Sequence, residues 1–206
     1  MHGKRRTAQD ADGSSDAVDQ EAPEALRRQL FAIIKARSFR RGRITLASGV
    51  ASDYYFDMKP TMFDPAGASL IAELLLDELA ELKVDAVGGL AIGAVPLVAT
   101  VVARSHQQGA PISGFFVRAQ VKDHGTKRRV EGTTENLTGK RVAILEDVTT
   151  TGGSAALAIE AACEDGAEVV GVVSVVDRLE GAPAHFGKLG IAFRWLFTAD
   201  EFLHGD

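Results

Sequence analysis

Two adjacent carboxylates, Glu146 and Asp147, end an apolar run and precede a segment rich in hydroxyls and glycines. The glycines let the main chain curl so that its N–H groups point inward, and the start of a following helix adds partial positive charge. Such a bend can hold one phosphate, while the carboxylates beside it can accept hydrogen bonds from sugar hydroxyls or bind a metal. We therefore predict a sugar-phosphate pocket. It comprises Glu146, Asp147, Val148, Thr149, Thr150, Thr151, Gly152, Gly153 and Ser154.

A second candidate is segment 118–132, which is densely cationic although the chain carries a net charge of −5. The segment is too polar to pack and lies between two predicted strands, so we expect a mobile loop. A mobile basic loop can close over a polyanion, exclude water and stabilise developing charge. The candidate catalytic residues of this loop are Arg118, Lys122, Asp123 and His124. A solvated charged loop is the alternative interpretation.

Two other segments give weaker signals. Residues 88–96 include three glycines that would let the main chain approach a diphosphate, although close helix–strand packing explains them equally well. Arg178 follows a buried strand, where its planar guanidinium suits a carboxylate or a ring carbonyl. An ion pair with Asp177 or Glu180 is the alternative for this arginine.

The elements predicted around these segments alternate between strands and helices. The predicted strands are 84–90, 112–117, 141–145 and 169–176, and the predicted helices are 66–82, 94–107 and 154–164. This alternation predicts an α/β fold with a mostly parallel central sheet flanked by helices. Ligands bind beyond the carboxyl ends of the strands in such sheets, so we expect the four candidate segments to converge on one crevice.

The N-terminal part of the chain is organised differently. Residues 1–22 are polar and bury too little apolar surface to offset the entropy of ordering, which predicts a disordered tail. From Pro23 apolar residues recur at helical spacing, and two short strands at 44–46 and 54–56 flank a turn. We expect one domain over residues 23–206.

The composition narrows the function classes. The chain has 206 residues, of which 46% are hydrophobic and 25% charged, as is usual for a globular domain. Its net charge of −5 argues against a general nucleic-acid binder. The single cysteine rules out an intrachain disulfide, and we find no signal-peptide core and no uninterrupted membrane span. We expect a cytoplasmic protein without nucleic-acid or membrane partners.

Together these segments resemble the type I phosphoribosyltransferase family, and most closely its orotate-using branch. Stretch 146–154 resembles the family signature for 5-phosphoribosyl 1-diphosphate (PRPP), and stretch 116–125 resembles the catalytic loop. Stretch 46–57 resembles the N-terminal hood that covers the base, and Arg178 resembles the residue that contacts orotate. The resemblance extends over about residues 25–200.

The resemblance implies that fold, with a hood at about residues 23–65 and a flexible catalytic loop, and the transfer of ribose 5-phosphate from PRPP to orotate. Glu146 and Asp147 would contact the ribose hydroxyls, and residues 149–154 would hold the 5-phosphate. The implied diphosphate ligands are Arg118, Lys122 and His124. The implied orotate contacts are Thr150, Arg178, Tyr55 and Phe56. Mg²⁺ would be bound through PRPP and water without a direct protein ligand, and a homodimer would share the catalytic loop between its subunits.

The sequence departs from the family pattern at Ala119, at Ala47 and at Ile92–Gly93, and three alternatives remain. Many members carry lysine at the position of Ala119, so one diphosphate or cross-subunit contact is expected to be missing. The alternatives are a phosphoribosyltransferase for purines or xanthine, a non-enzymatic sensor of PRPP, and a generic nucleotide-binding α/β domain. The last is disfavoured because the chain has no lysine-bearing phosphate loop.

Overall fold

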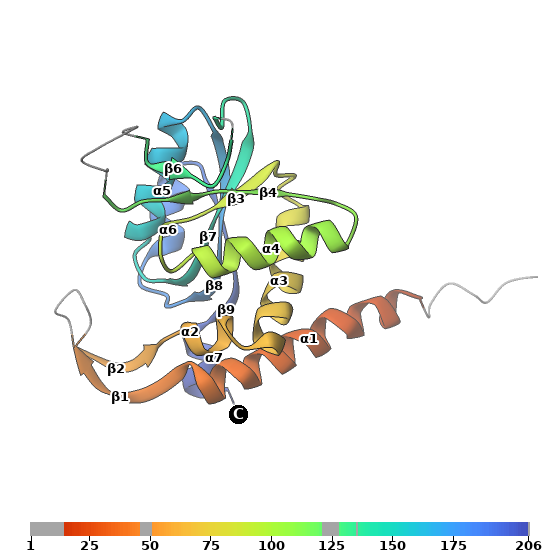
Figure 1. Cartoon of the computed structure of the whole chain (residues 1–206). Coiled ribbons are helices and arrows are strands. Elements are labelled where there is room, and N and C mark those ends of the chain that lie inside the picture. The colour runs from red at the N-terminus through yellow and green to blue at the C-terminus, as the bar shows by residue number, and fades with distance from the viewer. Residues whose placement is uncertain (1–14, 46–50, 121–127, 135, 206) are drawn as a thin grey trace, which may run out of the picture.

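The central sheet of the protein has five strands in the order β4-β3-β7-β8-β9, and every neighbouring pair is parallel. The computed structural model describes residues 15–45, 51–120, 128–134 and 136–205 (Figure 1). The strands are β3 (Ala86–Gly88), β4 (Ser113–Gly114), β7 (Arg141–Thr149), β8 (Glu168–Asp177) and β9 (Ala192–Thr198). The expected α/β fold with a parallel sheet is confirmed. Strand β9 lies beyond the last predicted element, which ends at residue 176.

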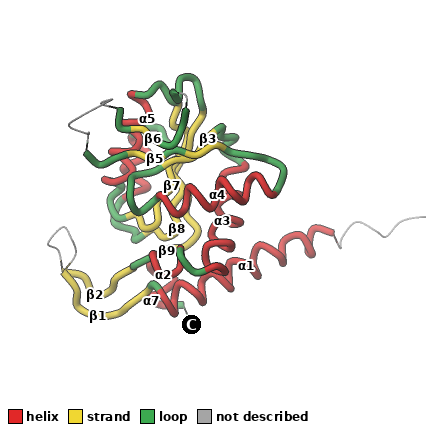
Figure 2. Tube along the Cα trace, in the orientation of Figure 1, coloured by secondary structure: helices red, strands yellow, loops and turns green. Residues whose placement is uncertain are grey.

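Helices cover both faces of this sheet, as Figure 2 shows. The helices are α3 (Pro65–Ala80), α4 (Val95–Gln107), α5 (Gly153–Glu164) and α6 (Ala182–Lys188). Leu75 of α3 and Leu97 of α4 share one buried cluster with Leu145 of β7. Ala158 of α5 and Phe186 of α6 share a second cluster with Ile144, the neighbour of Leu145. Adjacent strand residues point to opposite faces, so β7 is buried on both sides, as its apolar sequence predicts.

The segment predicted as one strand over 112–117 is divided into two. β4 joins the central sheet, whereas β5 (Phe116–Val117) pairs antiparallel with β6 (Val130–Glu131). The main chain still follows β3, since the N–H of Val117 donates to the carbonyl oxygen of Gly89 at 2.8 Å. The β5–β6 pair forms the base of the cationic loop and holds that base beside the end of β3.

A smaller layer of helices and one hairpin packs at one end of the sheet (Figure 1). It consists of α1 (Ser15–Arg37), β1 (Phe39–Thr45), β2 (Ala51–Phe56), α2 (Lys59–Met62) and the C-terminal α7 (Ala199–His204). Strands β1 and β2 are antiparallel. Helix α1 begins before Pro23, so residues 15–22 of the expected tail are helical, while residues 1–14 lie outside the described part of the chain.

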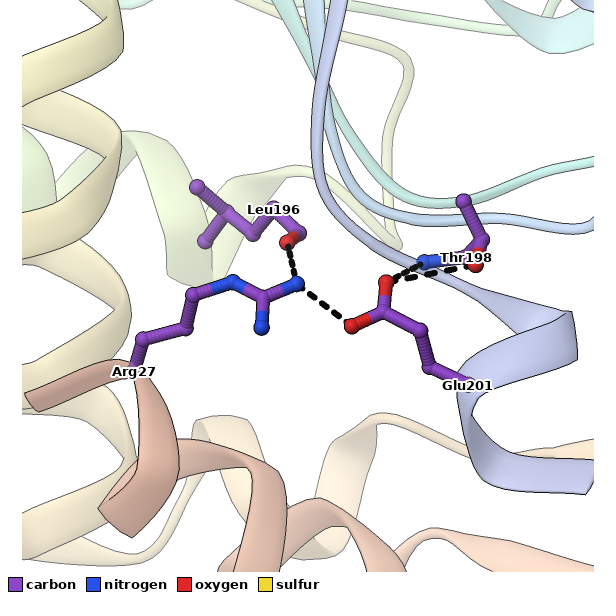
Figure 3. A network of polar contacts seen from close by, with 4 residues as sticks. All are labelled: Arg27, Leu196, Thr198 and Glu201. Atoms are coloured by element: carbon purple, nitrogen blue, oxygen red, sulfur yellow. Dashed lines mark hydrogen bonds and ion pairs between the residues drawn. The ribbon is translucent and has the colours of Figure 1, made fainter. Parts of the chain in front are cut away.

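Aromatic and polar contacts join this layer to the C-terminal end of the chain. The ring of Phe202 lies 5.7 Å from that of Phe39 and 5.2 Å from that of Phe56, measured between centroids. Arg27 donates to the carbonyl oxygen of Leu196 at 3.1 Å and pairs with Glu201 at 2.5 Å (Figure 3). The β1–β2 hairpin therefore packs against α7 through these aromatic side chains. Within the described residues, no helix is both long enough and apolar enough to cross a membrane.

Candidate functional site

The two predicted carboxylates lie near the carboxyl end of β7, which runs on to Thr149 instead of ending at Leu145. Glu146 is only 7% exposed, and its Oε1 has no hydrogen-bond partner among the described residues. Burial, together with the neighbouring charge of Asp147, raises the pKa of Glu146 to about 8. Burial also raises the pKa of Asp147, against the effect of hydrogen bonds from main-chain N–H groups. Both carboxyl groups therefore favour hydroxyl or cationic partners.

A tight bend at Gly152 joins β7 to α5. Gly152 has φ = +91°, and a Cβ atom there would lie 2.7 Å from the ring of Phe186. Both observations require glycine at this position. Helix α5 begins at Gly153, and the first N–H groups of a helix have no carbonyl partner within it. Thr151 and Ser154 are exposed beside the bend. The segment has the geometry of an anion site at a helix start.

Thr149 and Val148 differ from the expected phosphate ligands. The hydroxyl of Thr149 donates to Oγ of Ser174 at 2.9 Å, and the residue is only 2% exposed. Val148 packs against the larger hydrophobic cluster. The side chain of Thr149 is therefore buried and engaged, and that of Val148 is half-buried against the core. This corrects the expectation that the hydroxyl of Thr149 holds the phosphate. The main-chain N–H of Val148 donates to Oδ1 of Asp147 at 2.9 Å.

The glycine-lined segment after β3 lies directly against the carboxyl end of β7. A Cβ atom at Gly89 would stand 2.5 Å from the carbonyl oxygen of Leu145. A Cβ atom at Gly93 would stand 3.5 Å from a carboxylate oxygen of Asp147. Close packing thus explains Gly89, whereas Gly93 keeps the main chain beside a candidate site residue. Two of the four predicted segments meet at this point.

Arg178 lies at the end of β8, next to the bend. Its N–H donates to the carbonyl oxygen of Thr149 at 2.9 Å. Its side chain is only 5% exposed, and its Nη2 lies 2.8 Å from Oε1 of Glu180. The ion pair with Glu180, which was the alternative to a ligand-binding role for Arg178, is therefore present. Arginine is almost never fully buried unless it is paired, so this ion pair accounts for the burial. Nε of the same guanidinium is buried without a hydrogen-bond partner among the described residues, so donor capacity remains.

The hairpin β1–β2 reaches Arg178 through residues other than those expected. Oγ of Ser52 lies 3.2 Å from Nη2 of Arg178, and the guanidinium lies 4.6 Å from the ring centroid of Tyr54. Phe56 is 6% exposed and packs in the aromatic cluster, which corrects our expectation that it lines the base. Tyr55 is half-buried and follows Tyr54, so strand alternation points it to the other face of β2. That period of two in residues 51–56 is the signal that would have identified Ser52 and Tyr54.

The described part of the cationic loop is tied to its surroundings. Nε of Arg118 lies 2.9 Å from a carboxylate oxygen of Glu131 on β6. Arg128 makes two hydrogen bonds, of 2.7 and 2.6 Å, to Asp165 just beyond α5. Lys122, Asp123 and His124 lie outside the described residues. Arg118 consequently stands at the base of the loop, and Arg128 helps to attach its far end to the core.

The acidic strand end has further charged neighbours that the sequence did not reveal. Asp57 and Lys59 form an ion pair of 2.7 Å just after β2. Lys59 lowers the pKa of Asp147 and Asp57 raises it, although both effects are smaller than that of burial. No group of three or more potential metal ligands occurs among the residues that the structure describes. The charges here suit a ligand with hydroxyls and phosphates better than a metal held by protein groups alone.

Sequence comparison with known proteins finds phosphoribosyltransferases, both by family model and by individual relatives. The model of the phosphoribosyl transferase domain family matches residues 62–188. The orotate phosphoribosyltransferase of Bradyrhizobium diazoefficiens is 54% identical over 181 residues, which cover 87% of this chain and 97% of that protein. The orotate phosphoribosyltransferase of Rhodopseudomonas palustris strain TIE-1 is 54% identical over 182 residues, with the same coverage of 87% and 97%.

Solved structures agree with the sequence relatives. The orotate phosphoribosyltransferase of Mycobacterium tuberculosis in complex with Fe(III) dicitrate superposes with a TM-score of 0.75 at 36% identity, covering 86% of this chain and 98% of the other. The structure of that enzyme with PRPP gives a TM-score of 0.72 at 33% identity, with the same coverage. An adenine phosphoribosyltransferase from Thermoanaerobacter pseudethanolicus reaches a TM-score of 0.59 at 16% identity, covering 83% of this chain and 98% of the other. That last match concerns the fold alone.

Proposed function

The chain belongs to the phosphoribosyl transferase family, in its orotate phosphoribosyltransferase branch, and from this premise we propose how its residues carry out the reaction. The enzyme transfers ribose 5-phosphate from PRPP to orotate and releases diphosphate. The product is orotidine 5′-phosphate, an intermediate of de novo UMP biosynthesis. The observation that carries the assignment of roles is that the carboxylates of β7, the bend at Gly152 and Arg178 occupy neighbouring strand ends.

We assign the donor to the carboxyl end of β7. Glu146 and Asp147 accept hydrogen bonds from the ribose hydroxyls, which supply the partners that these buried carboxyl groups favour. The main chain of residues 148–149 and the whole of residues 150–154 hold the 5-phosphate at the start of α5. The positive φ of Gly152 supports this assignment, because it turns the main chain around a small anion.

We assign orotate to the space beside Arg178. The guanidinium binds the carboxylate of the base, because a buried planar fork matches that group in shape and charge. Thr150 provides a second contact from the phosphate bend. From the hood, Ser52 and Tyr54 lie beside Arg178, whereas Tyr55, the contact that the resemblance implies, follows on the other face of β2. The contact of Ser52 with Arg178 supports a hood that covers the base side of the site.

We propose that the cationic loop acts on the leaving group. Attack of a ring nitrogen on C1 of the donor gives a transition state with oxocarbenium character, as in glycoside chemistry, and negative charge builds up on the departing diphosphate. Arg118, Lys122 and His124 stabilise that charge. Asp123 or His124 can relay a proton, although the electron-rich orotate ring requires no strong base. The position of Arg118 at the base of the loop supports the assignment.

The residues present fit a Mg²⁺ ion carried by the donor. The unpartnered Oε1 of Glu146 and the neighbouring Asp147 offer oxygen atoms to hydroxyls or to water around such an ion, and no cluster for direct coordination occurs among the described residues. When bound, Mg²⁺ neutralises diphosphate charge. Glu146 and Asp147 would orient the ribose next to it.

We also propose the organisation of the working enzyme. Residues 23–206 form the phosphoribosyltransferase domain, with its hood from about residue 23 to 65, and residues 15–22 of the expected tail belong to helix α1. The protein is a homodimer in which each cationic loop reaches the neighbouring active site. The single cysteine, which can form no intrachain disulfide, supports a cytoplasmic location.

One assay tests the function. Purified protein is mixed with PRPP, Mg²⁺ and either orotate or a panel of purine bases, and base consumption is followed by ultraviolet absorbance. Orotate should be converted to orotidine 5′-phosphate, while adenine, guanine and hypoxanthine are not consumed. Turnover of a purine with orotate left intact would reject the proposed base specificity.

A further inference from the structure

Among the described residues, Ser52, Glu180 and Tyr54 lie around the guanidinium of Arg178. Nη2 contacts Oγ of Ser52 at 3.2 Å and Oε1 of Glu180 at 2.8 Å, and the ring of Tyr54 lies 4.6 Å from Cζ. The same side chain is 5% exposed, and its Nε is buried without a hydrogen-bond partner among the described residues. The guanidinium is thus fixed in position and retains donor capacity.

The neighbours are of two chemical kinds. Ser52 and Tyr54 are neutral, and each is held by other contacts: Oγ of Ser52 donates to the carbonyl oxygen of Tyr54 at 2.8 Å, and the Tyr54 ring packs 5.9 Å from that of Phe56. These two residues position the arginine without neutralising it. Glu180 differs because it supplies a full negative charge, which compensates a cation that is costly to bury alone.

Glu180 is also better placed to move than Arg178. Its side chain is 38% exposed, and it lies in the turn after β8 between Leu179, with φ = +60°, and Gly181, with φ = +107°. A carboxylate exposed to this degree can be solvated by water when another anion takes its place at the guanidinium. Arg178, buried and fixed by the hood, cannot follow it. The pair can therefore open from the glutamate side.

We propose that Glu180 competes with the carboxylate of the base for the guanidinium of Arg178 and thereby sets the affinity of the enzyme for orotate. This inference rests on the proposed function, in which Arg178 binds that carboxylate. One carboxylate replaces the other, so the buried cation keeps a counter-ion throughout. Binding of orotate must first release Glu180. The binding free energy of orotate therefore includes only the difference between the Arg178–orotate and Arg178–Glu180 ion pairs.

The test compares Glu180→Gln, which keeps the size of the side chain and removes its charge, with the parent enzyme. The Michaelis constant for orotate should fall roughly three- to tenfold, because the competing carboxylate is gone. The change should appear in KM for orotate and not in KM for PRPP. Glu168→Gln is the matched control, since it breaks the 2.9 Å pair with Arg141 at the opposite end of β8. That control should leave both constants at parental values.

A direct binding measurement completes the test. Isothermal titration with orotidine 5′-phosphate, which carries the same carboxylate, should give a lower dissociation constant for Glu180→Gln, with Glu180→Asp between it and the parent. An unchanged or higher KM for orotate in a folded Glu180→Gln variant would overturn the inference. A parent enzyme that forms no orotidine 5′-phosphate would instead reject the proposed function, so the two failures are distinguishable.

Discussion

The N–H of Arg178 donates to the carbonyl oxygen of Thr149 at 2.9 Å, which joins the ends of β8 and β7 by a main-chain hydrogen bond. The residue proposed to recognise the base is thereby held beside the bend proposed to hold the 5-phosphate. A rigid sheet sets the spacing between donor and acceptor subsites, and a fixed spacing of this kind favours direct attack of one reactant on the other.

Replacing Arg178 by alanine should weaken the binding of orotate and affect PRPP much less. Loss of a buried charged partner costs about 2–4 kcal/mol, so KM for orotate should rise roughly 100-fold. Steady-state kinetics with each substrate varied separately measures the effect. Arg194→Ala, which removes a guanidinium paired with Glu78 at 3.0 Å, serves as the control. An orotate KM that remained at the parental value would remove Arg178 from the base site.

The stability of the free enzyme should fall as the pH rises from about 4.5 to about 8. Burial raises the pKa of Glu146 above its ordinary value, so over this interval the folded state holds a proton that the unfolded state has already released. The free energy of unfolding should decrease by on the order of 1 kcal/mol per pH unit. Thermal melting at several pH values measures the slope, and Glu146→Gln should reduce it. A slope that Glu146→Gln leaves intact would assign the effect to another group.

Gly152→Ala should damage both folding and the donor site. The φ of +91° is unfavourable for alanine, and the new Cβ would lie 2.7 Å from the ring of Phe186. We expect the free energy of unfolding to fall by about 2 kcal/mol and KM for PRPP to rise. Gly187→Ala is the control, because a Cβ there meets nothing within 4 Å. Parental values for Gly152→Ala in both measurements would show that the bend tolerates a side chain and needs no special backbone.

Lys122→Ala should reduce turnover far more than it weakens donor binding, because the loop is proposed to act on charge that develops only in the transition state. A loss in kcat of about 100-fold or more is expected, as for other residues that stabilise developing charge. Lys188→Ala, on the surface of α6, provides the control. Turnover within a few-fold of the parent would refute the role of the loop.

Sharing of the loop between subunits can be tested by mixing two inactive variants. If the loop of one subunit serves the site of its partner, a hybrid of Lys122→Ala and Asp147→Asn subunits contains one site with neither lesion. Random subunit exchange should then restore about a quarter of the parental activity. A loop that serves its own subunit leaves one lesion in each hybrid site, so activity would not return.

Much of the site was predictable because parallel strands bring their carboxyl ends to one edge. Glu146, Asp147, Gly152 and Arg178 lie where that rule places them. The hood contacts were not predictable in the same way, since Ser52 and Arg178 are separated by 126 residues and meet only through tertiary packing.

The remaining misassignments have different causes. The strand containing Thr149 was expected to end earlier, so its hydroxyl was assigned to the phosphate and not to Ser174. Phe56 shares a face of β2 with Ser52 and Tyr54, but it lies further along the strand, where it packs against Phe39 and Phe202 in the core. Its role depends on this tertiary packing, which the hood motif alone does not reveal.

A crystal structure of the enzyme with PRPP and Mg²⁺ tests the proposed donor site most directly. Ribose hydroxyls should lie within hydrogen-bond distance of the carboxylates of Glu146 and Asp147, and the 5-phosphate should lie against the main chain of residues 150–154. A donor bound elsewhere, or carboxylates turned away from the ribose, would contradict it.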